Sequence, residues 1–201
     1  MAWIETVAYE DAVGQLLKLY DRIKGPGDNV DNIMLAHSLR PHTMEGHMAL
    51  YKHVLHHSRN TVAKWFLEVI GIYTSILNKC DYCVEHHYAG LTRMLNDGTR
   101  SKAIRVALEA SDWTTVFVPK EAAALGYVRK LTESPAKISD SEIRSLRSVG
   151  WEDGEILEIN QVTAYFNYAN RTVLGLGINT DTDILGRSPG DSADPTNWQH
   201  Q

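Results

Sequence analysis

The sequence predicts a single all-α domain. Apolar residues recur at helical spacing through most of the 201 residues, and no run alternates as a β-strand would. Stop signals such as GPG at 25–27 and NDG at 96–98 divide these periodic stretches into pieces of helix length. One ordinary domain with a proper core accommodates a chain of this length, so a second domain is not required.

The first helices follow from these signals. A helix is predicted over 8–24, where six apolar side chains share one face and GPG at 25–27 ends it. A short apolar segment follows at 30–39 and ends before Pro41. The next helix is predicted over 42–57, with apolar residues again at intervals of three and four.

The two central helices carry the residues of most interest. Asn60 or Thr61 is expected to cap a helix that runs through Ile76. After a turn near Asn78, another helix is predicted to continue to the stop signal at 96–98. A short turn between two helices favours an antiparallel helical hairpin.

The second half of the chain also has helical periodicity and signals for helix boundaries. A helix opens near Ser101, and Pro119 occupies the first-turn position of the next helix. SDSE at 139–142 is a capping box, in which the serine and glutamate satisfy each other's backbone donors. The last long helix is predicted over 151–174.

The domain is expected to span residues 1–178, followed by a tail over 179–201. This tail is polar, aperiodic and contains prolines, a composition typical of flexible chain ends.

The composition excludes several function classes. A net charge of −5 with scattered lysines and arginines argues against a nucleic-acid partner. No uncharged apolar stretch approaches the roughly 20 residues that span a bilayer, and the first residues lack the pattern of a secretory signal. We therefore expect a cytoplasmic protein without a membrane partner. Reducing conditions there leave most thiols free, so a pairing of two cysteines would be transient and chemical.

The segment SILNKCDYCVEHHYAGL, residues 75–91, contains both cysteines of the chain. Cys80 and Cys83 are three apart at a predicted helix start, where unpaired N–H groups and the helix dipole favour a thiolate. His87, four residues past Cys83, lies on the same face and can take a thiol proton. His86 points about 100° away and is the weaker candidate.

Glu68 is the expected partner of His87. The two residues lie about equally far along the chain from the turn near Asn78, so an antiparallel hairpin places them at the same height. A carboxylate there would orient the imidazole and raise its basicity. The predicted chain of contacts is Glu68, His87 and Cys83, with Cys80 close enough to form a disulfide.

These residues resemble the motif of the alkylhydroperoxidase D-like proteins, within the carboxymuconolactone decarboxylase superfamily. That motif is Glu, eleven residues, Cys-x-x-Cys, three residues, His, and it matches Glu68, Cys80, Cys83 and His87. SLRPHTMEGHMALYKHVLHHS and AYFNYANRTVLGLG resemble the flanking segments of the peroxidase-related branch. The resemblance covers roughly residues 8–178.

The resemblance implies an all-helical homo-oligomer with thiol peroxidase or disulfide reductase activity and no cofactor. Cys83 would attack a hydroperoxide, Cys80 would resolve the sulfenic acid into a disulfide, and His87 with Glu68 would relay the proton. An external dithiol, such as a lipoyl-bearing protein in some members, would restore the pair. Tyr82 stands where some relatives have a histidine, and a phenol cannot act as a base near neutral pH. The cysteine pair argues against lactone decarboxylation.

Two other functions remain open. The same cysteines would serve a redox sensor or adaptor without substantial peroxidase turnover. Alternatively Cys80, Cys83, His87 and either His53 or His57 would supply two thiolates and two imidazoles for a structural zinc ion. The identity of the nucleophile is also open, because a helix start favours Cys80 while proximity to His87 favours Cys83.

Two further groups have alternative roles. Three histidines near the end of the predicted 42–57 helix are more consistent with surface residues than with an active-site rim: His53, His56 and His57. Three polar residues of the last helix are expected to fix helix packing through hydrogen bonds or an ion pair, rather than to bind substrate: Asn167, Asn170 and Arg171.

Overall fold

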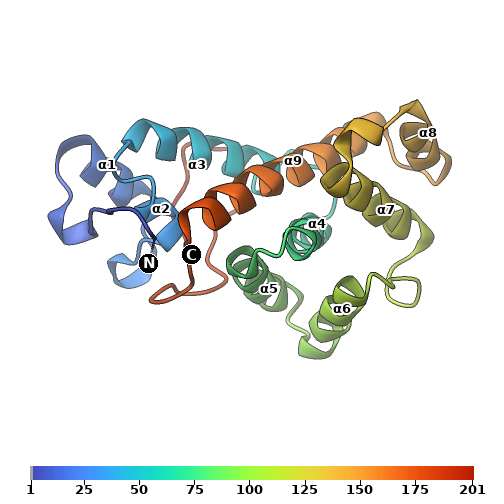
Figure 1. Cartoon of the computed structure of the whole chain (residues 1–201), viewed down its shortest axis with the longest axis horizontal. Coiled ribbons are helices and arrows are strands. Elements are labelled where there is room, and N and C mark those ends of the chain that lie inside the picture. Colours follow the sequence, from blue (N-terminus) through green and yellow to red (C-terminus); the bar gives the residue numbers. More distant parts are fainter. Residues whose placement is uncertain (1) are drawn as a thin grey trace.

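The computed structural model describes residues 2–201. Within that range the chain forms nine α-helices and no β-strand, with two isolated β-bridges in the loops. Figure 1 shows α4 and α5 nearly end-on in the middle of an elongated molecule, with α1 and α2 at one end and α7 and α8 at the other. The predicted all-α class is confirmed.

The helices follow the predicted order. The first helix, predicted from residue 8, begins only at Gly14, after a 3₁₀ turn at Tyr9–Asp11. Their bounds are α1 Gly14–Ile23, α2 Asn32–Leu35, α3 Pro41–Leu55, α4 Lys64–Leu77, α5 Asp81–Leu95, α6 Gly98–Ala110, α7 Pro119–Glu133, α8 Asp140–Ser148 and α9 Asp153–Leu176.

The predicted cap of α4 is wrong. The helix begins at Lys64 with Ala63 as its N-cap residue. The Asn60 side chain instead donates to Val54 O at 2.9 Å, and the Thr61 backbone N–H donates to the Glu158 carboxylate at 2.9 Å. Both candidate capping residues therefore tie the loop to neighbouring helices, which leaves the helix start to the residues that follow.

The capping box of α8 is confirmed. The Ser139 backbone N–H donates to the Glu142 carboxylate at 2.8 Å, and the Ser139 hydroxyl accepts from the Ser141 N–H at 3.3 Å. Pro119 is likewise the first residue of α7, as predicted. Such short-range signals depend only on neighbouring residues, which is why the sequence reveals them.

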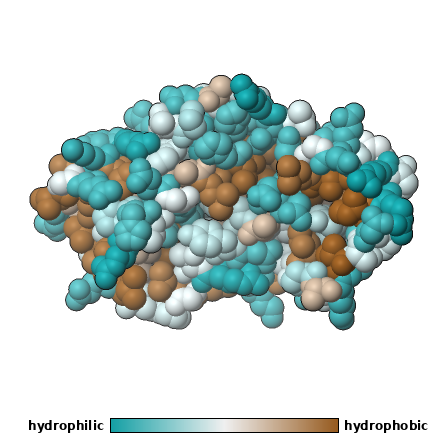
Figure 2. All heavy atoms as spheres, turned by 90° about the horizontal axis from the view of Figure 1, so that it is seen from above, coloured by the Kyte–Doolittle hydropathy of each residue, from teal (hydrophilic) through white to brown (hydrophobic). Residues whose placement is uncertain are grey.

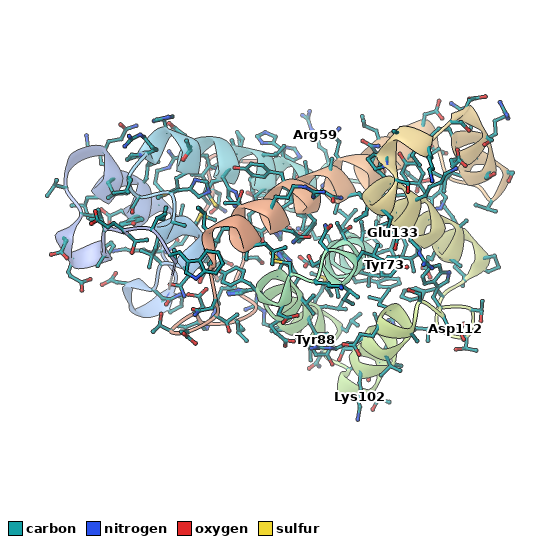
Figure 3. All side chains as sticks on the ribbon, in the orientation of Figure 1. Arg59, Tyr73, Tyr88, Lys102, Asp112 and Glu133 are labelled. Carbon is teal, nitrogen blue, oxygen red and sulfur yellow. The ribbon has the colours of Figure 1, made fainter. Side chains whose placement is uncertain are left out.

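The central element of the fold is α4. It is buried continuously from Phe66 to Ser75 and packs against α3, α5, α6, α7 and α9. Figure 3 shows the labelled Tyr73 of α4 directed toward α7, whereas Lys102 of α6 points away from the body. A helix enclosed in this way can hold a polar side chain out of water at a fixed position.

The tail, residues 179–201, lies against the helical body. The Asp183 carboxylate accepts from the Asn32 backbone N–H at 3.0 Å, and the fully buried Lys52 ammonium donates to Gly190 O. Trp198 is 4% exposed, with the Arg22 guanidinium over its ring. The sequence suggests flexibility for this segment because it lacks periodicity, but individual side chains anchor it. Flexibility of this segment in solution stays a prediction, which hydrogen exchange over residues 179–201 would test.

The molecular surface is mixed in character. Figure 2 shows hydrophobic side chains interspersed with hydrophilic ones over the face seen from above. Among residues 2–201, none of the helices combines the length and the apolar character needed to cross a bilayer.

Candidate active site

The two cysteines occupy the start of α5. Cys80 is the N-cap residue, and Cys83 lies in the first turn of the helix. The chain reaches them through Lys79, whose φ of 57° provides the sharp turn out of α4. Both sulfurs are free thiols and buried, with Cys80 at 0% and Cys83 at 4% exposed.

Glu68 and His87 meet across the α4–α5 hairpin. Glu68 Oε2 lies 2.7 Å from His87 Nδ1, and the Glu68 side chain is 5% exposed. The predicted contact between these residues is therefore present. Because Nδ1 is engaged by the carboxylate, Nε2 is the ring nitrogen that remains for a second partner.

Aromatic rings enclose the imidazole. The Phe166 ring meets His87 edge-on at 4.6 Å between centroids, and Tyr51 stacks on Tyr165 at 5.4 Å. Burial raises the pKa values of Tyr51 and Tyr165 well above the usual phenol value, so both remain neutral hydrogen-bond donors near pH 7.

A cavity of about 50 Å³ lies beside Cys83. This is several times the roughly 10–15 Å³ that holds one water molecule, so the cavity has room for a molecule of a few non-hydrogen atoms. We call it the Cys83 pocket, and the lining residues used below are Asp31, His47, Tyr51, Glu68, Cys83, His86, His87, Tyr165, Phe166, Gly186, Arg187, Ser188 and His200.

Cys80 faces a different opening. We call it the Cys80 cleft, and it is lined by Lys79, Cys80, Asp81, Tyr82, Glu85, Val173, Leu174, Ile178, Asn179 and Thr180. Cys83 does not line this cleft, and Cys80 does not line the Cys83 pocket. The two cysteines thus lie against different hollows of the surface, although Cys80 itself is fully buried.

The two thiols shift each other's pKa in opposite directions. The hydrogen bond from Cys83 lowers the pKa of the Cys80 thiol, and it outweighs the opposing effect of burial. The same hydrogen bond and burial raise the pKa of Cys83 well above its usual value. Cys80 therefore ionises first, while Cys83 keeps its proton until another base takes it.

Asn170 connects helix packing to the sulfurs. Its amide donates to Ser75 Oγ at 3.0 Å, and its oxygen accepts from the Asn78 amide at 3.0 Å. Its side chain also hydrogen-bonds toward both sulfurs, which lowers the pKa of each. The sequence predicted the packing role; the contact with the cysteines was missed, because no spacing pattern links residues on α5 and α9.

The other two polar residues of α9 differ in what they contact. Asn167 accepts from the Asn78 amide at 3.0 Å, and the Arg171 guanidinium donates to the Asn167 backbone carbonyl at 2.7 Å. The first bond joins α9 to the end of α4, as expected. The second lies within α9 and Arg171 is exposed, so the packing role expected of Arg171 is wrong.

Tyr82 and His86 belong to a separate network. Tyr82 donates to Asp183 Oδ2 at 2.7 Å, and His86 Nε2 lies 3.0 Å from the same oxygen. Tyr82 also accepts from the Ile33 backbone N–H at 3.2 Å. Both side chains therefore hold the tail to α5, and His86 lies outside the Glu68–His87 pair, as its helical position predicted.

Of the three histidines near the end of α3, His56 differs from the expectation. His53 and His57 are at the surface side of the helix end and stack on each other at 5.7 Å between centroids. His56 is buried, against the prediction, with Tyr51 edge-on at 4.7 Å, and burial lowers its pKa well below the usual value. The misprediction arose because α3 ends one residue before His56 and the chain turns inward there.

The zinc alternative lacks a ligand set. Neither His53 nor His57 lines the Cys83 pocket or the Cys80 cleft. Across residues 2–201, no group of three or more His, Cys, Asp or Glu side chains is arranged to hold a metal ion. The cysteines therefore lack the second histidine that this alternative requires.

Comparisons of the sequence itself are uninformative: no protein-family model matches it, and no curated protein matches it. Solved structures do match. An uncharacterized peroxidase-related protein from Ralstonia eutropha superposes with a TM-score of 0.74 at 20% identity, covering 92% of this chain and 96% of that one. One from a Silicibacter species gives 0.67 at 24% identity, covering 75% and 76%.

A third similar structure is the debrominase Bmp8, solved in complex with 2,3,4-tribromopyrrole. It matches with a TM-score of 0.68 at 17% identity, covering 87% of this chain and 89% of that one. At such identities the similarity concerns the fold. This chain therefore has the fold of the alkylhydroperoxidase D-like proteins, which is the fold that the sequence resemblance implies.

Proposed function

We propose that the protein is a thiol-dependent peroxidase that reduces small hydroperoxides through the Cys80–Cys83 pair, or reduces disulfides by the same pair. The observation that carries this proposal is the buried Glu68–His87 contact on the pocket that Cys83 lines. A nucleophile, a base and a group that orients the base form the arrangement that activates a cysteine.

The first chemical step is the activation of Cys83. The Glu68 carboxylate holds the proton of His87 on Nδ1, so Nε2 carries a lone pair that can take the Cys83 proton. The high pKa of Cys83 makes this base necessary, since the thiol does not ionise unaided near neutral pH.

The oxidation then proceeds in two balanced steps. The Cys83 thiolate forms an S–O bond as the O–O bond breaks, giving a sulfenic acid and an alkoxide that is protonated to the alcohol. The Cys80 thiolate attacks the sulfenic sulfur, and the departing hydroxide takes a proton from His87. The products are a disulfide, an alcohol and water.

The positions of the cysteines relative to the pocket and the cleft support Cys83 as the nucleophile and Cys80 as the resolving residue. Cys83 lines the pocket that contains His87, and Cys80 lines the opposite cleft. The lower pKa of Cys80 suits a resolving thiolate, which must attack once the sulfenic acid forms. An external dithiol, such as a lipoyl-bearing protein, would reach the disulfide through the Cys80 cleft.

The test is a turnover assay with hydrogen peroxide, cumene hydroperoxide and tert-butyl hydroperoxide, each combined with dithiothreitol or dihydrolipoamide as reductant. We expect turnover that requires the dithiol and disappears in Cys83→Ser. Retained turnover in that variant would refute Cys83 as the nucleophile.

Two outcomes would redirect the proposal. Disulfide formation at a rate too slow for turnover would favour a redox sensor or adaptor. Because Bmp8 shares the fold, the assay includes 2,3,4-tribromopyrrole with dithiol, and release of bromide without peroxide turnover would contradict the peroxidase.

A further inference from the structure

A second carboxylate–imidazole pair lies on the Cys83 pocket. His200, the penultimate residue, places Nδ1 at 3.0 Å from Asp31 Oδ2. The two side chains are 6% and 5% exposed, and both residues line the pocket together with Cys83 and His87. This pair resembles Glu68–His87 in its contact but comes from other elements: the residue before α2 and the tail.

The free nitrogen of His200 lacks a partner. Among the described residues, none hydrogen-bonds to His200 Nε2, although the atom is buried. A buried polar atom without a partner is unfavourable, and such atoms in native structures require an explanation. An oxygen of a substrate held in the Cys83 pocket would provide the missing hydrogen bond.

The partner of Nδ1 determines what Nε2 can do. The Asp31 carboxylate accepts a hydrogen bond from Nδ1–H and fixes the ring, so Nε2 is the atom left to exchange a proton with a molecule in the pocket. The neighbouring His47 cannot fill this role, because burial lowers its pKa to about 3 and keeps it neutral. His200 is thus the imidazole suited to donate a proton across the pocket from His87.

We propose that His200, oriented by Asp31, protonates the alkoxide or hydroxide that leaves when Cys83 attacks a hydroperoxide. The inference rests on the proposed peroxidase function. As the S–O bond forms and the O–O bond breaks, sulfur loses two electrons to the peroxide. The leaving oxygen takes the Nε2 proton of His200, and the products are the sulfenic acid and an alcohol. His200 then regains a proton from solvent.

The tail therefore contributes residues to the wall of the Cys83 pocket. His200 is held not only by Asp31 but also by its backbone N–H, which donates to Ile23 O at 3.3 Å. Three more tail residues line the same pocket: Gly186, Arg187 and Ser188. The acid would come from one end of the chain, and the base from the α4–α5 hairpin.

The test compares two oxidants whose leaving groups differ in their need for a proton. Hydrogen peroxide releases hydroxide, the conjugate base of water with a pKa of about 15.7. Peracetic acid releases a carboxylate, whose acid has a pKa of about 4 and which leaves without help. Single-turnover oxidation of the reduced protein is followed for wild type, His200→Gln, Asp31→Asn and the control His53→Gln, an exposed histidine outside the pocket.

We expect His200→Gln to slow oxidation by hydrogen peroxide about 100-fold, the lower part of the range for general acid catalysis. Oxidation by peracetic acid should change less than about threefold by the same reasoning. Asp31→Asn should show the same preference to a smaller degree, and His53→Gln should match wild type with both oxidants.

Three results would overturn the inference. An equal loss with both oxidants would mean that His200 only supports packing, and an unchanged rate with both would mean that it does nothing in this step. If His200→Gln unfolds, Asp31→Asn must carry the same oxidant preference, or the inference is wrong. A wild-type protein that neither oxidant converts to the disulfide contradicts the peroxidase itself, and the inference with it.

Discussion

At the scale of single residues, the candidate site depends on how buried polar side chains pair with one another. Glu68 is held in a nearly water-free position and contacts His87 directly. Truncating or neutralising one member of such a pair leaves the other without its partner in a low-dielectric environment, where that loss is largest.

The first prediction concerns the charge of Glu68. Glu68→Gln keeps the size of the side chain but removes the carboxylate that accepts from His87 Nδ1 and orients the ring. We expect kcat/KM for hydroperoxide to fall about 10- to 100-fold, as for other residues that orient a reacting imidazole. Stopped-flow kinetics on wild type and variant measures this change.

The control is Glu133→Gln, at an exposed i,i+4 ion pair with Arg129 on α7, labelled in Figure 3. Surface pairs of this kind contribute little, so kcat/KM should stay at the wild-type value. A similar fall in both variants, or in neither, would contradict a specific role for Glu68.

The second prediction concerns the effect of each cysteine on the pKa of the other. Because Cys83 lowers the pKa of Cys80, Cys83→Ala should raise the pKa of the remaining thiol, so that a higher pH is needed to ionise it. Because Cys80 raises the pKa of Cys83, Cys80→Ala should lower it. Ultraviolet thiolate absorbance, recorded against pH on both variants, gives the two values. Shifts of the opposite sign would show that the thiols are not coupled in this way.

A contact between two side chains can be predicted from the sequence when the residues are close along the chain and regular helices connect them. Glu68 and His87 are 19 residues apart on the two arms of one hairpin, and their spacing predicts the contact. Asp31 and His200 are 169 residues apart, and no pattern in the sequence connects them. The same reason explains why Asp183 was not recognised as the partner of Tyr82 and His86.

At the scale of elements, the site depends on a close crossing of α4 and α9. A Cβ built at Gly71 of α4 would lie 2.2 Å from the Phe166 ring of α9. The same ring packs edge-on against His87. The missing side chain at Gly71 therefore allows α9 to approach and to fix the position of the imidazole.

The third prediction follows from this crossing. Gly71→Ala should destabilise the protein by about 1–3 kcal/mol, the usual range for overpacking a dense core. It should also reduce peroxidase activity, because Phe166 must move against His87. Urea denaturation gives the free energy of unfolding, and steady-state kinetics gives the activity.

Gly46→Ala on α3 is the matched control. No atom lies within 4 Å of its added Cβ, so the helix should gain stability, by about 0.5–1 kcal/mol. If Gly71→Ala were also neutral or stabilising, the close crossing would not exist in solution.

Element boundaries show the limits of local signals. Pro119 and the Ser139–Glu142 box mark their helix starts because their physical effect is confined to neighbouring residues. Asn60 and Thr61 have the chemistry of capping residues, yet tertiary partners occupy them instead. A capping preference of about 1 kcal/mol is easily outweighed by such contacts.

At the scale of the whole molecule, the tail connects the two ends of the chain. Lys52 and Lys64 bind its middle through Gly190 O and the Asp191 carboxylate, and Trp198 packs beneath Arg22. The tail is irregular, so no periodic pattern could predict its path. Its buried contacts nevertheless provide a reason for order.

The fourth prediction tests the order of the tail. Trp198→Ala should cost about 3 kcal/mol, the lower part of the range for a buried tryptophan. It should also speed amide hydrogen exchange across residues 179–201, because the largest buried side chain of the tail is lost. Hydrogen exchange followed by mass spectrometry measures this locally.

Trp3→Ala is the control, since Trp3 is 79% exposed and its loss should change stability by less than about 0.5 kcal/mol. Fast exchange over 179–201 in the wild type would instead support the flexible tail that the composition suggests.

Assembly is also a property of the whole molecule. The homo-oligomer implied by the sequence resemblance stays a prediction, and sedimentation equilibrium of the purified chain tests it directly. A monomer at micromolar concentration would contradict it.

The account rests on which sulfur meets the oxidant. The direct measurement is mass spectrometry of the single-cysteine variants Cys80→Ser and Cys83→Ser after one equivalent of hydroperoxide and a sulfenic-acid trap. We predict a labelled sulfenic acid on Cys83 in the first variant and none on Cys80 in the second. A label on Cys80 alone would contradict the proposed order, and with it the roles of His87 and Glu68.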